Sequence, residues 1–308
     1  MENVIIKLIE NDKSEREVVP ASFRFVRERY TPYTQCSGVL IGSYSIADVY
    51  SIELYYKGQI LHKGMADSIQ RRYLNGRHII TFLSRGFTML LGQNEPVPGI
   101  ISDVTLGSLI SGNTTIPHVT CETASKKVNY IYVKEKSTIW DAVCAYAYKA
   151  YTNYPYIAGT NTVQVSIPTS SKKFRYSNLD IVSAGESLCL SGIISKAYMS
   201  DLNGDYIYSA ENSDACSEEI IREKYYPLDR QWYSSPSEGL QSKLNYSNRK
   251  QYFVWVKYKG HLFENLLDRA SYSGEGVEMR SERISAIEFA GNKNGVFTTI
   301  SVYQDSYS

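Results

Sequence analysis

The stretch LHKGMADSIQRRYLNGRHIITFLSRG, from Leu61 to Gly86, decides the fold of this chain. Together with the preceding YSIADVYSIELYYKGQI it indicates consecutive β-strands, rich in Tyr, Ile, Val and Ser. The pairs Lys57-Gly58 and Asn75-Gly76 stand where hairpin turns are expected, because glycine accepts positive φ without strain. We therefore predict strands joined by hairpins in the first third of the chain.

The segment FTMLLGQNEPVPG, which follows Gly86, predicts a short apolar helical turn stopped by Gly92, Pro96 and Pro98. We place the first domain boundary here, so that residues 1–95 form one β-rich unit. Upstream, SFRFVRERY sets apolar residues among charged ones and predicts a further strand.

The middle of the chain changes pattern. STIWDAVCAYAYKAY predicts the clearest helix, because Thr138 and Asp141 fit the capping box in which hydroxyl and carboxylate satisfy free N–H groups. VNYIYVKEK before it and TVQVSIP after it predict strands, the second ended by Pro168. ISDVTLGSLISG, from Ile101 to Gly112, predicts a short helix beginning near Asp103. Residues 96–170 are thus expected to form a small α/β insert.

From Lys172 onward the β pattern returns. We predict a hairpin turning at Asn203-Gly204, a helix that leads into a strand at 251–259, and a long hairpin over 283–303. SEEIIREKYYP is either a short helix or an edge strand. The predicted fold class is β-rich α+β, with a second β-rich unit at residues 171–308.

Composition narrows the classes of function. The chain has 308 residues, among them 27 Tyr, 9 Phe and 3 Trp, which favours a protein with much surface committed to partners. Its net charge of +1 gives no overall attraction to nucleic acid or to an anionic membrane. No apolar run approaches the ~20 residues that a membrane span needs. The short basic clusters are interpreted as solvated turn or edge-strand residues: Arg71-Arg72, Lys126-Lys127 and Lys172-Lys173-Arg175.

The cysteines argue for folding in a reducing compartment. They are odd in number, widely spaced and form no C-x-x-C pair: Cys36, Cys121, Cys144, Cys189 and Cys216. A disulfide framework and a zinc site are therefore disfavoured, and we expect reduced thiols in a cytoplasm.

The residues that could carry catalysis do not form a recognisable motif. The histidines are scattered without ligand spacing and are interpreted as structural: His62, His78, His118 and His261. Cys144 lies mid-helix, and GESLC at 185–189 lacks the closing glycine of a nucleophile elbow. Asp201, Asn203 and Asp205 start like a calcium loop but lack its glycine and final glutamate. We predict no catalytic, cofactor-binding or metal-binding residues; a hydrolase with a scattered site is the least favoured alternative.

The central segment resembles LysM modules, which bind cell-wall glycans. The resemblance rests on a strand, a helix start, an asparagine and a closing strand, at Val133, Thr138, Ile139, Trp140, Asn161, Ile167 and Pro168. The Gly-Asp pair that shapes the sugar-contacting loop in that family is replaced by Lys136-Ser137. The resemblance implies an alternative function, a peptidoglycan-binding protein that uses the LysM-like insert.

A second resemblance covers nearly the whole chain. The order of features resembles the baseplate hub proteins of phage tails and contractile injection particles, of the late-control-protein-D type. In that family an Arg-Gly or Arg-Ser pair leads into a short apolar helix and then Asn-Glu-Pro-Val-Pro, as in SRGFTMLLGQNEPVPG here. The insert with YPYIAGTNTV follows in the expected place, and LQSKLNYSNRKQYFVWVKYKG resembles the helix and strand of the second barrel.

This second resemblance implies a homotrimeric ring without enzymatic activity or cofactor. Each subunit would supply two tube-like β-barrel modules, so that three chains adapt a six-fold tail tube to a three-fold spike. The implied partners are the chain itself, the tail tube protein, the spike or needle protein, other baseplate proteins and the tape measure. The particle, a phage tail or a phage-tail-like bacteriocin (tailocin), would assemble in the bacterial cytoplasm and leave by lysis.

Overall fold

A computed structural model describes residues 3–112, 115–123, 126–228, 230, 235–274 and 276–305. The chain divides into two compact units. The larger unit comprises residues 1–184 and 255–301, and the smaller unit comprises residues 185–254 and 302–308. Among the described residues, no helix has the length and apolar character to cross a membrane.

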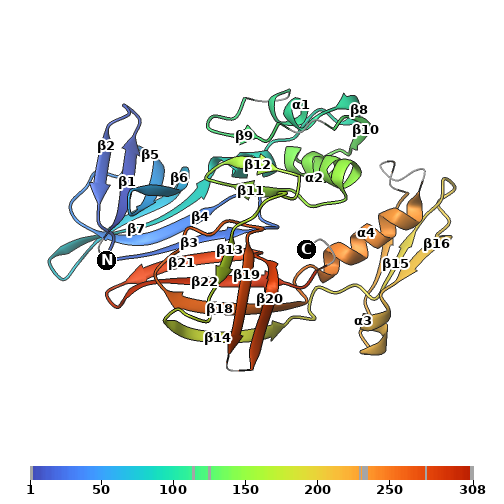
Figure 1. The fold of residues 1–308 in the computed structure, drawn as a ribbon. Helices are drawn as coiled ribbons and strands as arrows, with labels where there is room; N and C mark the ends of the chain where they lie inside the picture. The colour runs from blue at the N-terminus through green and yellow to red at the C-terminus, as the bar shows by residue number, and fades with distance from the viewer. Residues whose placement is uncertain are drawn as a thin grey trace. The chain divides into compact units, whose positions relative to one another are not determined.

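A sheet of 11 strands is the main element of the described residues (Figure 1). Both β-rich parts of the sequence contribute to it, because β3 pairs antiparallel with β21. In spatial order the strands are β14 (Ile181–Leu188), β18 (Tyr252–Lys259), β22 (Gly295–Tyr303), β21 (Ala286–Asn292), β3 (Ser22–Glu28), β4 (Gln35–Ile41), β7 (Arg77–Gly86), β6 (Gln59–Leu74), β5 (Val49–Tyr56), β1 (Val4–Glu10) and β2 (Glu15–Val18).

The predicted strands and turns of the first third are confirmed. Tyr56 pairs with Gln59 and Leu74 with Arg77, so each hairpin has a two-residue loop. All four loop residues have positive φ, from 47° at Lys57 to 77° at Gly58. Two successive positive φ values define the turn whose twist matches antiparallel strands, and this is why the Lys-Gly and Asn-Gly pairs stand there.

The sheet is rolled around its own core. The rings of Tyr56 on β5 and Phe289 on β21 lie 4.9 Å apart, although these strands stand five places apart in the sheet. In a flat sheet they would be separated by about 24 Å, since neighbouring strands lie about 4.8 Å apart. Phe23 on β3 also packs against Phe289, with ring centroids 4.9 Å apart. One continuous apolar cluster with Ile6, Ile52 and many others therefore fills the curve.

The insert holds two helices and two small sheets. Helix α2 (Ile139–Tyr151) is confirmed where it was predicted, and it packs on α1 (Leu106–Ser111). One sheet pairs β8 (Gly99–Val104) with β10 (Val128–Val133). The other has the order β11 (Tyr156–Ala158), β12 (Thr162–Gln164) and β9 (Thr120–Cys121). The predicted helical turn before the insert is the 3₁₀ helix η1 (Phe87–Gly92).

The prediction of a helix over 101–112 is half wrong. Residues up to Val104 form β8, because β10 supplies a ladder of backbone hydrogen bonds to them. The helix begins only after Thr105, whose side chain accepts a hydrogen bond from the backbone N–H of Ser108. Asp103, the predicted start, has a φ of 56° and lies outside the helix. Tertiary pairing has overridden the local apolar spacing.

The last third of the chain forms the strands and the helix that its sequence pattern predicts. The larger unit also holds a three-stranded sheet of β13 (Lys173–Arg175), β19 (Arg269–Gly274) and β20 (Val277–Arg283). The smaller unit pairs β15 (Lys196–Met199) with β16 (Tyr208–Glu211) and β17 (Glu223–Tyr226). Helix α4 (Pro236–Asn248) packs on this sheet through Leu240 and Leu244. The predicted hairpin around Asn203-Gly204 and the predicted helix before the strand at 252–259 are confirmed. The segment 217–227, for which the sequence left a short helix or an edge strand open, starts at the end of helix α3 (Ser213–Ser217) and contains β17.

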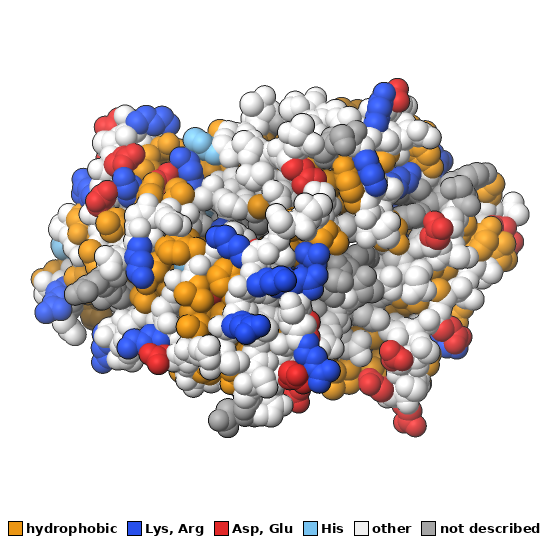
Figure 2. All heavy atoms as spheres, in the orientation of Figure 1, with side chains coloured by type: hydrophobic (Ala, Val, Ile, Leu, Met, Phe, Trp, Pro, Cys, Tyr) orange, Lys and Arg blue, Asp and Glu red, His pale blue; other side chains and the backbone are white. Residues whose placement is uncertain are grey.

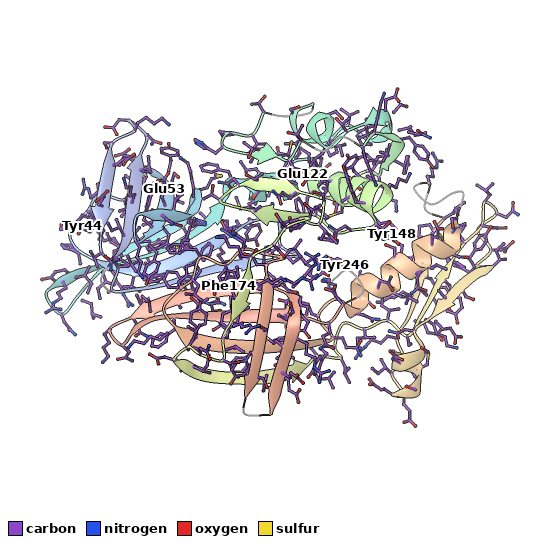
Figure 3. All side chains as sticks on the ribbon, in the orientation of Figure 1. Tyr44, Glu53, Glu122, Tyr148, Phe174 and Tyr246 are labelled. Carbon is purple, nitrogen blue, oxygen red and sulfur yellow. The ribbon has the colours of Figure 1, made fainter. Side chains whose placement is uncertain are left out.

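The observed fold is therefore β-rich α+β, as predicted. It consists of one large curled sheet, small mixed sheets and few helices. The strand predicted to end at Pro168 is shorter, because β12 ends at Gln164. Beyond it, the N–H and hydroxyl of Ser166 bind the carboxylate of Glu122 at 3.0 and 2.8 Å (Glu122 is labelled in Figure 3).

Candidate functional site

The positions of the LysM-like pattern do not form one exposed face. Val133, Trp140 and Asn161 are buried, with 2%, 6% and 2% of their surface exposed. Ile167 is exposed, and Pro168 is half-buried. Val133 lies on β10, which pairs with β8, whereas Asn161, Ile167 and Pro168 lie just outside β12, a strand of the other small sheet. These residues serve the fold of the insert.

Thr138 has the capping role that the sequence predicts. Its Oγ1 accepts a hydrogen bond of 3.1 Å from the N–H of Asp141, and its own N–H donates to the Asp141 carboxylate at 2.8 Å. Two of the free N–H groups at the start of α2 are thereby satisfied. Trp140, the next residue but one, packs into the apolar core of the insert with Val143 and Tyr146.

Asn161 joins the insert to the large sheet. Its Nδ2 donates to the carbonyl of Lys63 on β6 at 2.8 Å, and its Oδ1 accepts from the N–H of Thr88 on η1 at 3.3 Å. Gly86 lies directly against it, since a Cβ there would come within 2.9 Å of Oδ1. The side chain of Asn161 is buried and both of its polar atoms hydrogen-bond backbone groups, so this position acts as a joint.

Two buried arginines reinforce the same joint. Arg27 on β3 donates to the carbonyl of Gly159 at 2.6 Å and to Oδ1 of Asn265 at 3.0 Å. Arg29 donates to Oδ1 of Asn153 at 3.0 Å, and Asn153 in turn donates to the carbonyl of Val165. Burial lowers the pKa of Arg27 to about 10, so the side chain is still a cation at neutral pH. The insert is therefore held to the sheet by buried, charge-assisted hydrogen bonds.

Sequence reasoning missed these arginines, although a signal was present. In SFRFVRERY the alternation of Phe23 and Phe25 continues through Arg27 and Arg29. Alternate residues of a strand point to the same face, so the two arginines follow the phenylalanines inward. A cation on a buried face requires partners, and the insert supplies them.

The fold brings two of the four scattered histidines to the same buried region. His62 lies between the hydroxyls of Thr34 and Ser84, at 2.8 and 2.9 Å, and His261 contacts Thr298 Oγ1 at 3.1 Å. Burial, aided by the charge of Arg27, lowers the pKa of each imidazole to about 3. They are neutral and enclosed at physiological pH, which makes them structural, as predicted. His78 is half-buried on β7 and His118 is exposed.

A buried carboxyl lies beside His261. Glu264 accepts hydrogen bonds from Tyr176 Oη at 3.1 Å, from Tyr258 Oη and from the N–H of Leu262 at 3.2 Å. Burial raises the pKa of Glu264. Its oxygens are used to fix the irregular segment after β18, so this group also supports the fold and faces no open surface.

The other residues considered for catalysis or metal binding have structural roles. Burial raises the pKa of the Cys144 thiol to about 12, so little thiolate exists at pH 7. Asp201 accepts from the N–H groups of Asn203 and Asp205, at 2.8 and 2.9 Å, which is the hydrogen bonding of a turn. Among the described residues, no three His, Cys, Asp or Glu side chains are grouped so that they could hold a metal ion.

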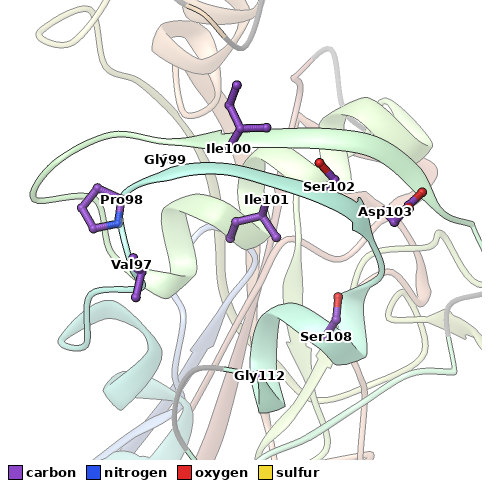
Figure 4. A pocket seen from close by; sticks show the side chains of 9 residues that line it. All are labelled: Val97, Pro98, Gly99, Ile100, Ile101, Ser102, Asp103, Ser108 and Gly112. Carbon is purple, nitrogen blue, oxygen red and sulfur yellow. The ribbon is translucent and has the colours of Figure 1, made fainter.

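A pocket lies between β8 and α1 of the insert (Figure 4). It has a volume of about 500 Å³ and is lined by 97–103 together with Ser108 and Gly112. Its one carboxylate, Asp103, is paired with Lys127 at 3.0 Å. Val97 and Ile100 are 77% and 67% exposed beside it. This arrangement suits contact with a partner better than it suits chemistry.

Exposed apolar side chains gather in two further places. At the tip of the β6–β7 hairpin, Tyr73 is 68% exposed and Leu74 is 47% exposed, next to basic residues of the same tip. In the smaller unit, the outer face of the β15–β17 sheet carries Tyr198 and Tyr225, whose rings stack at 4.7 Å. Exposed aromatic residues of this kind are typical of protein–protein interfaces.

Comparison with solved structures identifies the fold. The chain is similar to the tail protein from Neisseria meningitidis, with a TM-score of 0.73 and 13% identity over 99% of this chain and 98% of that one. It is equally similar to the 43 kDa tail protein of prophage MuSo2 from Shewanella oneidensis, with a TM-score of 0.74 and 12% identity over 98% of both chains. A component of the E. coli type VI secretion system, itself described as similar to phage T4 tail proteins gp27 and gp5, matches 94% of this chain and 75% of that one at 7% identity, with a TM-score of 0.57.

No protein-family model matches the sequence, and no curated protein matches it. The similarity is therefore one of fold, carried by the whole chain and not by a shared motif. The chain has the fold of phage tail proteins and of hub-like components of contractile injection systems, as the second sequence resemblance predicts.

Proposed function

We propose that this chain is the structural hub of a phage tail or phage-tail-like particle, where three copies form a ring between the tail tube and the spike. The observation that carries the proposal is the extent of the fold similarity. Two phage tail proteins match this chain almost end to end, with TM-scores of 0.73 and 0.74. In this proposal the role of the chain is structural and not enzymatic.

The large sheet supports a description as two tube-like modules. Residues 1–95 supply β1 to β7, and residues 171–308 supply β14, β18, β21 and β22. The two sets meet at β3 and β21, where Phe25 stands opposite Phe289. In this proposal each set is one module, residues 96–170 are the insert, and three chains present six modules to a six-fold tube.

The buried joint supports a load-transmitting role. Arg27, Arg29 and Asn161 connect the sheet to the insert through buried hydrogen bonds, which resist shear better than an apolar contact because their geometry is directional. A hub that sits between tube and spike requires such internal rigidity. The exposed hairpin tip with Tyr73 and Leu74 then serves as a contact to the tube protein.

The proposed partners are a second and third copy of the chain, the tube protein, the spike or needle protein, other baseplate proteins and the tape measure. One solved relative, with a TM-score of 0.55 and 11% identity, is described as a PdpA–VgrG complex, which is consistent with a place in such an assembly. Assembly in the bacterial cytoplasm and release by lysis complete the proposal.

Deletion of the coding gene from the producing cell tests this function. We expect the tube protein to be made but no spike-bearing tails to be pelleted, and we expect a wild-type copy in trans to restore them. Normal tails from the deletion strain would contradict the proposal.

A further inference from the structure

The sheet of β13, β19 and β20 carries a row of cations on its outer face. Lys173 stands opposite Arg269, and Arg269 stands opposite Arg283, so three basic residues lie side by side across three strands. Two residues along, Arg175 stands opposite Ser271 and Ser271 opposite Arg280. Directly opposed residues share a face of a sheet, and so do residues i and i+2. These five cations, the basic face, therefore point the same way.

The other face of this sheet is the buried one. Ala270, Tyr272 and Met279 are 0%, 5% and 2% exposed, whereas Lys173, Arg175 and Arg280 are exposed and Arg269 and Arg283 half-buried. Figure 2 shows Lys and Arg side chains gathered over this region, in a chain whose net charge is only +1. The positive charge is thus a local feature of one surface.

Among the residues that the structure describes, few carboxylates compensate the charge of the basic face. On it, Glu278 pairs with Arg280 at 2.8 Å. Arg269 donates to the carbonyl of Ser281 at 2.7 Å and Arg283 to that of Leu267 at 3.4 Å, which satisfies donors without neutralising either charge. Burial and the nearby Arg269 and Arg29 lower the pKa of Arg283. Like charges directly opposite one another destabilise a sheet, so an anionic partner would relieve a cost that the isolated subunit bears.

The smaller unit presents the complementary charge. The stretch from α3 to the start of β17 carries the two cations Arg222 and Lys224 but exposes four carboxylates, the acidic segment: Asp214, Glu218, Glu219 and Glu223. The guanidinium of the nearby Arg222 donates a hydrogen bond of 3.2 Å to the carbonyl of Ile193. Tyr225 follows the segment with its ring exposed, and tyrosine faces attract guanidinium groups. A nucleic acid fits less well, because a chain of balanced charge has no general attraction to it.

We propose that the acidic segment of one copy docks on the basic face of the next copy. The two surfaces differ, so the contact is heterologous and repeats head to tail, and such contacts close into a ring when the rotation between copies closes. This inference rests on the proposed trimeric hub and names the surfaces that close its ring.

Sedimentation equilibrium of the purified full chain, in 50 and 500 mM NaCl, tests the contact. We expect wild type to self-associate and high salt to weaken it, because the interface is charged. The double variants K173E/R175E and E218K/E219K replace exposed residues, and each should weaken association by about tenfold or more. The quadruple variant, which exchanges the two charges, should recover most of the loss. The control K57E/K293E makes the same change in charge at two exposed turns and should leave association unchanged.

Three results would overturn the inference: a wild type that stays monomeric at low salt, association that neither double variant weakens, or a quadruple variant that fails to recover. The hub function is judged separately, by incorporation of wild type into particles. If wild type is incorporated while the charge exchange fails, the hub stands and the ring closes through other surfaces.

Discussion

Asn161 in the insert and Lys63 on β6 are joined by a hydrogen bond of 2.8 Å, from the asparagine Nδ2 to the lysine carbonyl. The two residues stand 98 positions apart in the sequence. Asn161 also accepts from Thr88, so a single side chain ties three segments together. The insert is consequently part of the larger unit's framework.

Replacing Asn161 with alanine should therefore destabilise the protein. The carbonyl of Lys63 and the N–H of Thr88 would lose buried partners, which costs about 1–3 kcal/mol for each group left unsatisfied. Urea denaturation measures the loss. Asn203→Ala, in the exposed turn of the smaller unit, is the matched control and should change stability by less than about 0.5 kcal/mol. Equal stability of the two variants would show that the Asn161 side chain does not stabilise the connection between the insert and the large sheet.

The roll of the large sheet depends on Phe289. Its ring packs on Phe23 and Tyr56 from strands on both sides of the core. Truncation to alanine removes both contacts, and we expect a loss of about 3–5 kcal/mol in the free energy of unfolding. Phe297→Ala, on the half-buried face of β22, should cost clearly less. If the two substitutions cost the same, the core is not organised around Phe289.

Stability should fall as the pH is lowered below about 6.5. His62 and His261 have folded-state pKa values of about 3, below the ordinary value of 6.5, so the unfolded chain binds protons more readily. Their contribution is fully present above pH 6.5 and is lost as the pH falls toward 3, by up to about 1.4 kcal/mol per pH unit for each histidine. The raised pKa of Glu264 acts in the opposite sense, since its contribution is lost as the pH rises above 4.5.

Denaturation at pH 5, 6, 7 and 8 measures this slope. His62→Gln removes one of the two buried histidines, so the slope between pH 6.5 and 5 should fall by up to about 1.4 kcal/mol per pH unit, whatever the absolute stability of the variant. A variant with the wild-type slope would show that His62 is protonated in the folded state.

The hairpin tip should matter for assembly and not for folding. Tyr73 and Leu74 are exposed, so the double variant Y73S/L74S should keep its unfolding free energy within about 0.5 kcal/mol of wild type. In a deletion strain complemented with it, we expect several-fold fewer tails in which hub and tube co-sediment. Asn294→Ser, in the exposed β21–β22 turn, is the control. Full assembly with Y73S/L74S would show that the hairpin tip does not contact the tube protein.

Local patterns predicted those parts of the fold that local chemistry controls. The Lys57-Gly58 and Asn75-Gly76 turns and the Thr138 cap follow from residues a few positions apart. The helix predicted from Ile101 failed at its start because β10, more than 20 residues later, pairs with that segment. The roll of the sheet likewise depends on long-range contacts such as Tyr56 with Phe289, which no local pattern contains.

The surfaces were the least predictable part. The sequence predicts solvated turn or edge-strand residues at Lys172, Lys173 and Arg175, and β13, which carries Lys173 and Arg175, is an edge strand. Their meeting with Arg269 and Arg283, about 100 residues away, depends on parallel pairing of β13 with β19. The LysM-like positions show that a sequence pattern can also suggest a binding surface that the fold does not form. Asn161 matched a glycan-binding pattern by spacing, but its side chain is used by Lys63 and Thr88.

Quantitative mass spectrometry of tail particles pelleted from the producing cell tests the central claim most directly. Three hub subunits facing a six-fold tube predict one copy of this chain for every two subunits of a single tube ring. That ratio, constant across preparations, is the expected result. Absence of the chain from particles, together with its retention on purified cell-wall sacculi, would contradict the hub and favour a peptidoglycan-binding protein.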